Sequence, residues 1–381
     1  MDWPVYSPDF NSIEHVWDML GRRIAARQPP PTCLPELRRA LLDEWCNIPQ
    51  DQIDNLILSM PRRSLWDILE GLKWVNQNIA YFGGDPTRIT FAGESTGSNT
   101  VGLFSASPLT KGLFIRQIMQ SGAPFLLGLG NMTVNLMFSQ QIAKIVGCAD
   151  DDNTIENNPK FVVECLKGVD SVSLSKADFR INPRRSIALV PRFGDEFLPE
   201  DPKEVIFHQK FPCTELLIGN NRDEGSFQIT TFNPELFGFF GEKNTFFTKE
   251  QGQDRIRRIF QNFTDPEAVV NHYLPANFPE DDYPGIRYQV YTSLGDKVFV
   301  CPDVYHAEKC AENGGKVYFY WWAHRSSNSP WAPWMGAAHF SELEFIFGQP
   351  LLNPSDFEPE ELEISEQMIE IWSSFVKEGC V

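Results

Sequence analysis

The sequence predicts an α/β fold in which helices cover both faces of a parallel β-sheet. Short apolar segments that suit buried strands alternate with longer segments whose apolar residues recur at helical spacing. Strands that are separated by helices pair in parallel, because the chain must cross over between them. With 381 residues, 42% of them hydrophobic, the chain can bury a large core.

The first 63 residues predict a small helical segment of different composition. They hold seven arginines, no lysine and nine acidic residues, a net charge of −2, whereas the whole chain carries −18. Prolines separate three apolar stripes, because proline cannot continue a helix from within. We therefore divide the chain into residues 1–63 and 64–381. The stripes are Ile13, Val16, Trp17, Leu20 and Ile24; Leu34, Leu37, Leu41 and Trp45; and Ile53, Leu56, Ile57 and Met60.

Beyond residue 63, the pattern predicts alternating helices and strands. A helix is expected to begin with Asp67 as its N-cap, to bury Ile68, Leu72 and Val75, and to end before two consecutive glycines. The predicted strands cover residues 88–92, 115–120, 216–219 and 317–322, and a last helix covers residues 364–376 with a stripe of Met368, Ile371, Trp372 and Phe375.

The charge and cysteine content exclude several classes of protein. Asp and Glu total 51 against 33 Lys and Arg, so the chain repels nucleic-acid phosphates and anionic lipid. No apolar run is long enough to span a membrane, and residues at the start of the chain do not form a signal peptide. The eight cysteines include no Cys-x-x-Cys pair. We expect neither a metal site nor a cofactor.

The motif Gly93-x-Ser95-x-Gly97 lies between a predicted strand and a predicted helix. In that context it predicts a nucleophile elbow, a sharp turn whose serine projects above the sheet and whose flanking residues must be small. The N–H of Thr96 would then lie at the helix start, where it can stabilise an oxyanion. The simpler interpretation is an ordinary turn, since Ser and Gly are common turn residues.

A serine nucleophile needs a base and an acid, and the expected order along the chain is serine, acid, histidine. Glu224 directly follows a predicted strand, so it would emerge at the strand's C-terminal end, where catalytic groups gather in parallel sheets. His339 lies in a loop of small residues. Each residue alone also fits a structural role, as a surface turn glutamate and a hydrogen-bonded loop histidine.

From about Leu65 to Gly379 the sequence resembles the type-B carboxylesterases, and within them the cholinesterases. The matching stretches are Phe82–Pro86, Phe91–Gly97, Gln120–Gly122, Asn221–Ser226, Trp331–Gly336 and Glu344–Gly348. The resemblance implies the α/β-hydrolase fold and hydrolysis of a small carboxylic ester through an acyl-enzyme. It also implies Ser95 as the nucleophile, Glu224 as the acid and His339 as the base.

The resemblance leaves the substrate open between choline esters and a wider range of carboxylic esters. Glu94 and Phe227 match positions of the site where cholinesterases hold a quaternary ammonium by cation–π contact. Ile187, within residues 185–189, matches the acyl pocket, where acetyl-specific enzymes carry bulky phenylalanines. A roomier pocket and broader acyl chains are therefore expected.

The resemblance also implies an extracellular glycoprotein. Cys148 and Cys165 match a disulfide of the family, and Asn131 and Asn262 begin glycosylation sequons. It does not indicate an oligomeric state.

Two features depart from the family pattern. No His-Gly-Gly-Gly-like loop occurs, so an incomplete fold without its N-terminal strands, and with fewer oxyanion donors, is expected.

The stretch Trp3–Trp17 instead resembles the C-terminal end of a Tc1/mariner transposase, with Glu14 as the third acid of its metal-binding trio. One carboxylate cannot hold two metal ions, so transposase chemistry is excluded. The alternatives to an esterase are a non-catalytic, cholinesterase-like adhesion protein and an inactive chimera.

Overall fold

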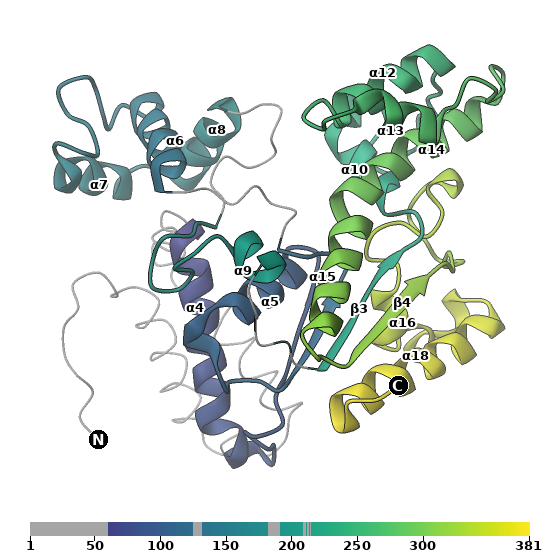
Figure 1. Ribbon diagram of the computed structural model, residues 1–381, viewed down its shortest axis with the longest axis horizontal. Coiled ribbons are helices and arrows are strands. Elements are labelled where there is room, and N and C mark those ends of the chain that lie inside the picture. Colours follow the sequence, from purple (N-terminus) through teal and green to yellow (C-terminus); the bar gives the residue numbers. More distant parts are fainter. Residues whose placement is uncertain (1–59, 125–131, 182–190, 209–210, 212, 214) are drawn as a thin grey trace. The chain divides into compact units, whose positions relative to one another are not determined.

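The computed structural model describes residues 60–124, 132–181, 191–208, 211, 213 and 215–381 (Figure 1). The stripes predicted within residues 1–59 lie outside the described residues, as do Asn131 and Ile187.

The strands are β1 (Thr90–Glu94), β2 (Arg116–Gln120), β3 (Glu215–Asn221) and β4 (Val317–Trp322). The helices are α4 (Met60–Asn78), α5 (Thr96–Ala106), α6 (Met132–Ile145), α7 (Pro159–Lys167), α8 (Ser171–Ile181), α9 (Pro202–His208), α10 (Glu224–Phe232), α11 (Pro234–Phe237), α12 (Lys249–Ile259), α13 (Pro266–Tyr273), α14 (Tyr283–Gly295), α15 (Cys301–Glu312), α16 (Leu343–Ile346), α17 (Gln349–Leu352) and α18 (Pro359–Glu378). Single turns are η1 (Ile79–Phe82), η2 (Pro108–Thr110), η3 (Asp296–Val300), η4 (Pro333–Met335) and η5 (Pro354–Asp356).

The chain forms two compact units. One consists of Met1–Thr87 and Gly128–Glu200, and the other of Arg88–Leu127 and Asp201–Val381. The described part of the first unit holds α4, α6, α7 and α8. The sheet, and every described residue of the predicted Ser-Glu-His set, belong to the second unit.

The sheet of the second unit is parallel throughout its four described strands, in the order β1-β2-β3-β4. Its register aligns Glu94 with Gln120, and Gln120 with Gly219. The C-terminal ends of β1, β2 and β3 therefore lie side by side, and the residues that follow them meet at one edge. This is the edge at which parallel sheets collect ligand and catalytic groups.

Helices cover both faces of this sheet, as the sequence predicts. Because alternate strand residues face opposite sides, Met119 and Ile218 pack on one face and Ile118 and Leu217 on the other. The first face packs against α5, α9 and α15, and the second against α16 and α18 (Figure 1). A further helical layer formed by α10–α14 has its own apolar core.

A π turn, η3, interrupts the run of helix from α14 to α15. Pro302 follows it and has no N–H, so one carbonyl of the preceding turn loses its helical donor. In the π turn, the N–H of Cys301 donates to the carbonyl of Asp296, five residues back. The π turn carries Phe299, whose side chain is buried.

The predicted elements are present, but their bounds differ. β4 has the predicted bounds, whereas β1 begins and ends two residues later than predicted. The prediction that a helix starts at Asp67 is wrong, because α4 already begins at Met60. Its buried stripe is Leu65, Leu69 and Leu72, while Ile68 is 37% exposed. The last helix is longer than predicted: Pro359 suits its first turn, and Gly379, with φ of 71°, ends it.

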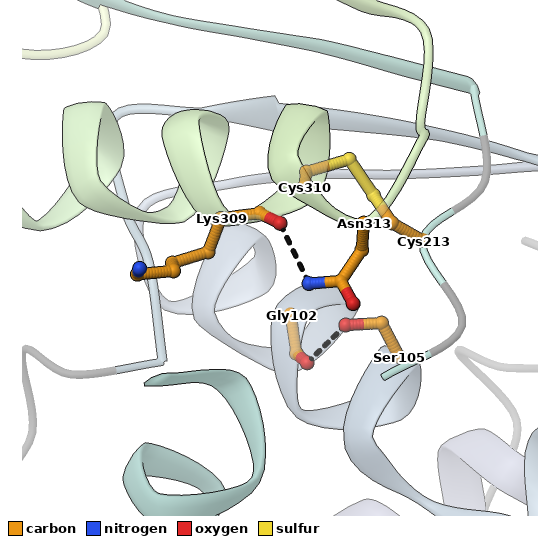
Figure 2. The surroundings of a disulfide bond; sticks show 6 residues. All are labelled: Gly102, Ser105, Cys213, Lys309, Cys310 and Asn313. Carbon is orange, nitrogen blue, oxygen red and sulfur yellow. Dashed lines mark hydrogen bonds between the residues drawn. A yellow bond between two sulfur atoms is a disulfide. The ribbon is translucent and has the colours of Figure 1, made fainter. Parts of the chain in front are cut away.

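The described residues contain two disulfides. The predicted pair Cys148–Cys165 is bonded and lies beside the small apolar core around Val162. The second disulfide, Cys213–Cys310, was not predicted; it joins the segment before β3 to the end of α15 (Figure 2). In the described ranges, no helix combines the length and apolar content needed to cross a bilayer.

Removal of the Cys213–Cys310 disulfide by the double change Cys213→Ser and Cys310→Ser is predicted to lower the free energy of unfolding. The bond spans 97 residues of sequence, and native disulfides typically contribute about 2–5 kcal/mol, more for longer loops. Urea unfolding followed by circular dichroism measures the change. Cys301→Ser is the control, because Cys301 is free and exposed; equal urea midpoints for the two variants would contradict the prediction.

Candidate active site

Ser95 occupies a strained turn between β1 and α5. Its φ of 56° and ψ of −116° are rare for a residue with a side chain. Hydrogen bonds hold the turn on both sides. The N–H of Ser95 donates to the carbonyl of Gln120 at 2.8 Å, and the carbonyl of Ser95 accepts from the N–H of Asn99 at 3.0 Å. This is the geometry of the predicted nucleophile elbow.

The backbone packs so closely around Ser95 that two neighbouring positions require glycine. A Cβ at Gly93 would lie 2.3 Å from the carbonyl carbon and oxygen of Gly97. A Cβ at Gly122, just after β2, would lie 2.6 Å from the carbonyl oxygen of Ser95. By contrast, a Cβ at Gly97 would meet no atom within 4 Å. The first glycine of the motif is therefore sterically required and the second is not.

The structure brings Ser95, His339 and Glu224 into one hydrogen-bonded line. His339 Nε2 lies 2.8 Å from Ser95 Oγ, and His339 Nδ1 lies 2.6 Å from Glu224 Oε2. The other oxygen of Glu224 accepts from the N–H of Asn221 at 2.7 Å. His339 and Glu224 are each 1% exposed, whereas Ser95 is only partly buried. The simpler interpretation treats Glu224 as a surface turn residue and His339 as an ordinary loop residue. In the structure both are buried and hydrogen-bonded to each other.

The segment that carries Glu224 also fixes the loop that carries His339. The N–H of Asp223 donates to the carbonyl of Ala337 at 3.0 Å, and the N–H of Ala337 donates to Asp223 Oδ2 at 2.9 Å. Asn221 Nδ2 donates to the carbonyl of Ala338 at 2.9 Å. These bonds hold the segments that carry Glu224 and His339 at a fixed separation. None of them involves the side chain of Glu224 or that of His339.

Three phenylalanines surround the His339 ring. The ring centroid of Phe340 lies 4.3 Å from it, that of Phe299 4.5 Å and that of Phe227 5.7 Å. Phe227 also contacts Trp331, at 5.5 Å between ring centroids. These rings restrict the orientation of the imidazole and shield it from solvent.

The electrostatics favour a histidine with a raised pKa. Burial lowers the pKa of His339, but the charge of Glu224 and its hydrogen bond, with the charges of Glu94 and Glu342, outweigh burial and raise it above 6.5. Burial raises the pKa of Glu94 to about 8, against the charge of His339. Glu94 Oε1 lies 3.2 Å from His339 Nε2 and makes no hydrogen bond of its own.

Glu342, which the sequence did not predict as a site residue, has a buried carboxyl group beside the site. It accepts from Gln120 Nε2 at 2.9 Å and from Asn221 Nδ2 at 2.6 Å. Burial and the charge of Glu224 raise its pKa. One sequence feature could have indicated this residue: Glu342 lies three residues after His339 and beside apolar residues. A carboxyl group buried among apolar residues needs a hydrogen-bond partner.

The remaining predicted site residues are placed as follows. Glu94, the last residue of β1, and Phe227, in α10, lie against His339. Thr96 is the first residue of α5, so its N–H has no acceptor within the helix. Among the described residues, no cluster of His, Cys, Asp and Glu could hold a metal ion.

Comparison with known proteins identifies relatives of the chain. A profile of the carboxylesterase family matches residues 63–380. Acetylcholinesterase-1 of Trittame loki is 37% identical over 325 residues, covering 82% of this chain and 57% of that protein. The acetylcholinesterase of Leptinotarsa decemlineata is 33% identical over 327 residues, covering 83% of this chain and 50% of that protein. The chain thus spans about half the length of the curated relatives it matches, and its covered parallel sheet is that of the α/β-hydrolase fold.

Alanine at each glycine of the motif provides a matched test of the elbow. Gly93→Ala is predicted to slow labelling of Ser95 by a fluorescent organophosphonate about 100-fold or more, because the added methyl group must displace the turn. Gly97→Ala should label within about threefold of the unchanged protein, since its Cβ meets no atom within 4 Å. Equal labelling rates of the two variants would contradict the steric argument.

Proposed function

The chain belongs to the carboxylesterase family, and we propose that it hydrolyses small carboxylic esters through an acyl-enzyme formed on Ser95. The observation that carries the proposal is the continuous hydrogen-bonded line from Ser95 Oγ through the His339 ring to Glu224. A hydroxyl becomes an effective nucleophile when a neutral imidazole accepts its proton and a carboxylate orients that imidazole.

In the acylation step, Ser95 Oγ attacks the ester carbonyl carbon while His339 Nε2 accepts the hydroxyl proton. Glu224 accepts the hydrogen bond of Nδ1–H, which fixes the tautomer and stabilises the imidazolium. The N–H of Thr96 donates to the oxyanion of the tetrahedral intermediate. When the intermediate collapses, His339 gives its proton to the departing alkoxide and the acyl group stays on Ser95.

In the deacylation step, water attacks the acyl-enzyme. His339 Nε2 takes a proton from the water and returns it to Ser95 Oγ as the carboxylic acid leaves. The phenylalanines around His339 exclude bulk water from the imidazole, which strengthens its interaction with Glu224.

For the alcohol part of the substrate, the ring of Phe227 and the carboxyl of Glu94 are the proposed contacts. The relatives named above are acetylcholinesterases, and a quaternary ammonium suits an aromatic face beside a negative charge. The raised pKa of Glu94, about 8, means that this charge is mostly absent at pH 7. We therefore propose that both uncharged and cationic esters are substrates, with cationic esters increasingly favoured as the pH rises through about 8.

We also propose an extracellular protein. The two disulfides of the described residues suit an oxidising compartment. Asn262, which begins a sequon, is exposed in the turn after α12 and is accessible for glycosylation.

The nucleophile assignment predicts that Ser95→Ala abolishes both ester hydrolysis and labelling by a fluorescent organophosphonate. Removing a triad nucleophile costs about 10⁶-fold in turnover, which takes the rate below a typical assay background. Ser105→Ala is the control: Ser105 is buried near the C-terminal end of α5 and donates to the carbonyl of Gly102, so its loss leaves the reactive hydroxyl and its turn in place. Unchanged turnover in the Ser95→Ala variant would exclude the proposed mechanism.

The pKa of Glu94 predicts how substrate preference changes with pH. Between pH 6.5 and 9 the ratio of kcat/KM for a cationic ester to that for its uncharged isostere should rise roughly fivefold or more, because Glu94 gains its charge as the pH passes about 8. The titration of His339 affects both substrates and cancels in the ratio. Glu94→Gln should give a flat ratio, and a rise that persists in this variant would assign the effect to another group.

A further inference from the structure

Asp303 is a buried carboxyl that the proposed mechanism does not use. It lies in the first turn of α15 and is 0% exposed. Asn220 Nδ2, at the end of β3, donates to Asp303 Oδ2 at 2.7 Å. The backbone N–H of Gly122, just after β2, interacts with the same carboxyl group. One side chain from a covering helix therefore contacts the ends of two neighbouring strands.

Both strand ends lead directly to residues of the Ser-His-Glu line. Gly122 lies against the carbonyl of Ser95, where it has no room for a Cβ. Asn220 precedes Asn221, whose N–H donates to Glu224 Oε1 at 2.7 Å. Gly122 thus supports the nucleophile, and Asn220 adjoins the residue that supports the acid.

We propose that Asp303 is a positioning residue, which holds the ends of β2 and β3 at a fixed separation and so keeps Ser95 and Glu224 at their correct distances on either side of His339. The inference rests on the proposed function, because it assigns to Asp303 a role in that reaction. Asp303 itself touches neither the substrate nor the reacting atoms.

Asp303 acts as a hydrogen-bond acceptor through one of its oxygens. Burial raises its pKa well above the usual range, and the charge of Glu224 raises it further. Asp303 Oδ1 makes no hydrogen bond. An asparagine can therefore replace Asp303, with its oxygen accepting from Asn220 and its NH₂ in place of the unused oxygen.

The Cys213–Cys310 disulfide supplies a matched comparison on the same helix. It attaches the C-terminal end of α15 to the segment before β3 (Figure 2). Asp303 attaches the N-terminal end of α15 to Asn220, near the C-terminal end of β3. Loss of the disulfide loosens the C-terminal end of α15, which lies away from the site. Loss of the Asp303 contacts loosens the N-terminal end, which lies next to the site. Only the second change should alter catalysis if Asp303 positions the catalytic residues.

The experiment compares steady-state hydrolysis by Asp303→Leu, Asp303→Asn and the variant without the Cys213–Cys310 disulfide. Asp303→Leu should lower kcat roughly 10- to 100-fold, with KM within about threefold, because a misplaced catalytic group slows the chemical step. Asp303→Asn should keep kcat within about threefold, because its side-chain oxygen accepts the same hydrogen bond from Asn220. The variant without the disulfide should lose stability but keep kcat. If Asp303→Leu does not fold, Asp303→Ser, whose hydroxyl is too short to reach Asn220, replaces it.

A measurement that needs no turnover separates this inference from the proposed function. The proton between His339 Nδ1 and Glu224 gives a low-field ¹H NMR resonance when the two groups are in hydrogen-bond contact. The resonance should persist in Asp303→Asn and disappear or shift in Asp303→Leu. A protein with the resonance but no hydrolysis would refute the proposed function, and the comparison of the two variants would still decide the role of Asp303.

The positioning role is overturned if Asp303→Leu keeps both kcat and the resonance. It is equally overturned if Asp303→Asn loses as much activity as Asp303→Leu, or if the variant without the disulfide loses as much kcat. Absence of the resonance from the unchanged protein would overturn the inference and the proposed triad together.

Discussion

The contact between Glu224 and His339 is the interaction on which the rest of the site depends. Both groups are 1% exposed, and their atoms lie 2.6 Å apart. A carboxylate without solvent is costly unless hydrogen bonds replace water. Here they come from the imidazole and from the N–H of Asn221. If either partner is removed, the other stays buried and loses one of its two hydrogen bonds, so the backbone must keep both in place. The bonds between Asp223 and Ala337 do this, since they join the two segments next to the reacting groups.

The strain at Ser95 follows from the same requirement. Side chains within a strand stand roughly perpendicular to the sheet, but Ser95 follows the end of β1 and must point toward a buried imidazole. A positive φ achieves this at a cost of about 1–3 kcal/mol. The register of the sheet helps to offset that cost, because β1 and β2 end together and the N–H of Ser95 therefore finds the carbonyl of Gln120. The absence of a Cβ at Gly93 and Gly122 lets the turn pack without further strain.

The sequence predicted features that depend on local pattern, and missed those that depend on distant packing. The elbow was readable because the need for glycine is local, and β4 because its apolar run is continuous. The start of α4 was misplaced because Asp67 suits an N-cap as well as the partly buried position inside the helix that it occupies. The Cys213–Cys310 disulfide joins residues 97 apart, with no sequence pattern to pair them. Glu342 and Asp303 are polar residues of a kind usually found at the surface, so only the fold reveals their burial. The roles of Ser95, Glu224 and His339 remain predictions, now with a geometry that suits them.

Four acidic residues lie in or around the site, and their electrostatics suit a single charged pair. The pKa values of Glu94, Glu342 and Asp303 are all raised, first by burial, and the charge of Glu224 contributes to each shift. The negative charge of Glu224 thus favours the uncharged form of the three neighbouring carboxyl groups. This matters for His339, because each further charge nearby would raise its pKa and leave less of it as the neutral base that accepts the serine proton. Burial of Glu94 and Glu342 therefore limits, without removing, the negative charge that raises the pKa of His339. The hydrogen bonds of Glu342 and Asp303 meanwhile hold the strand ends that carry the site.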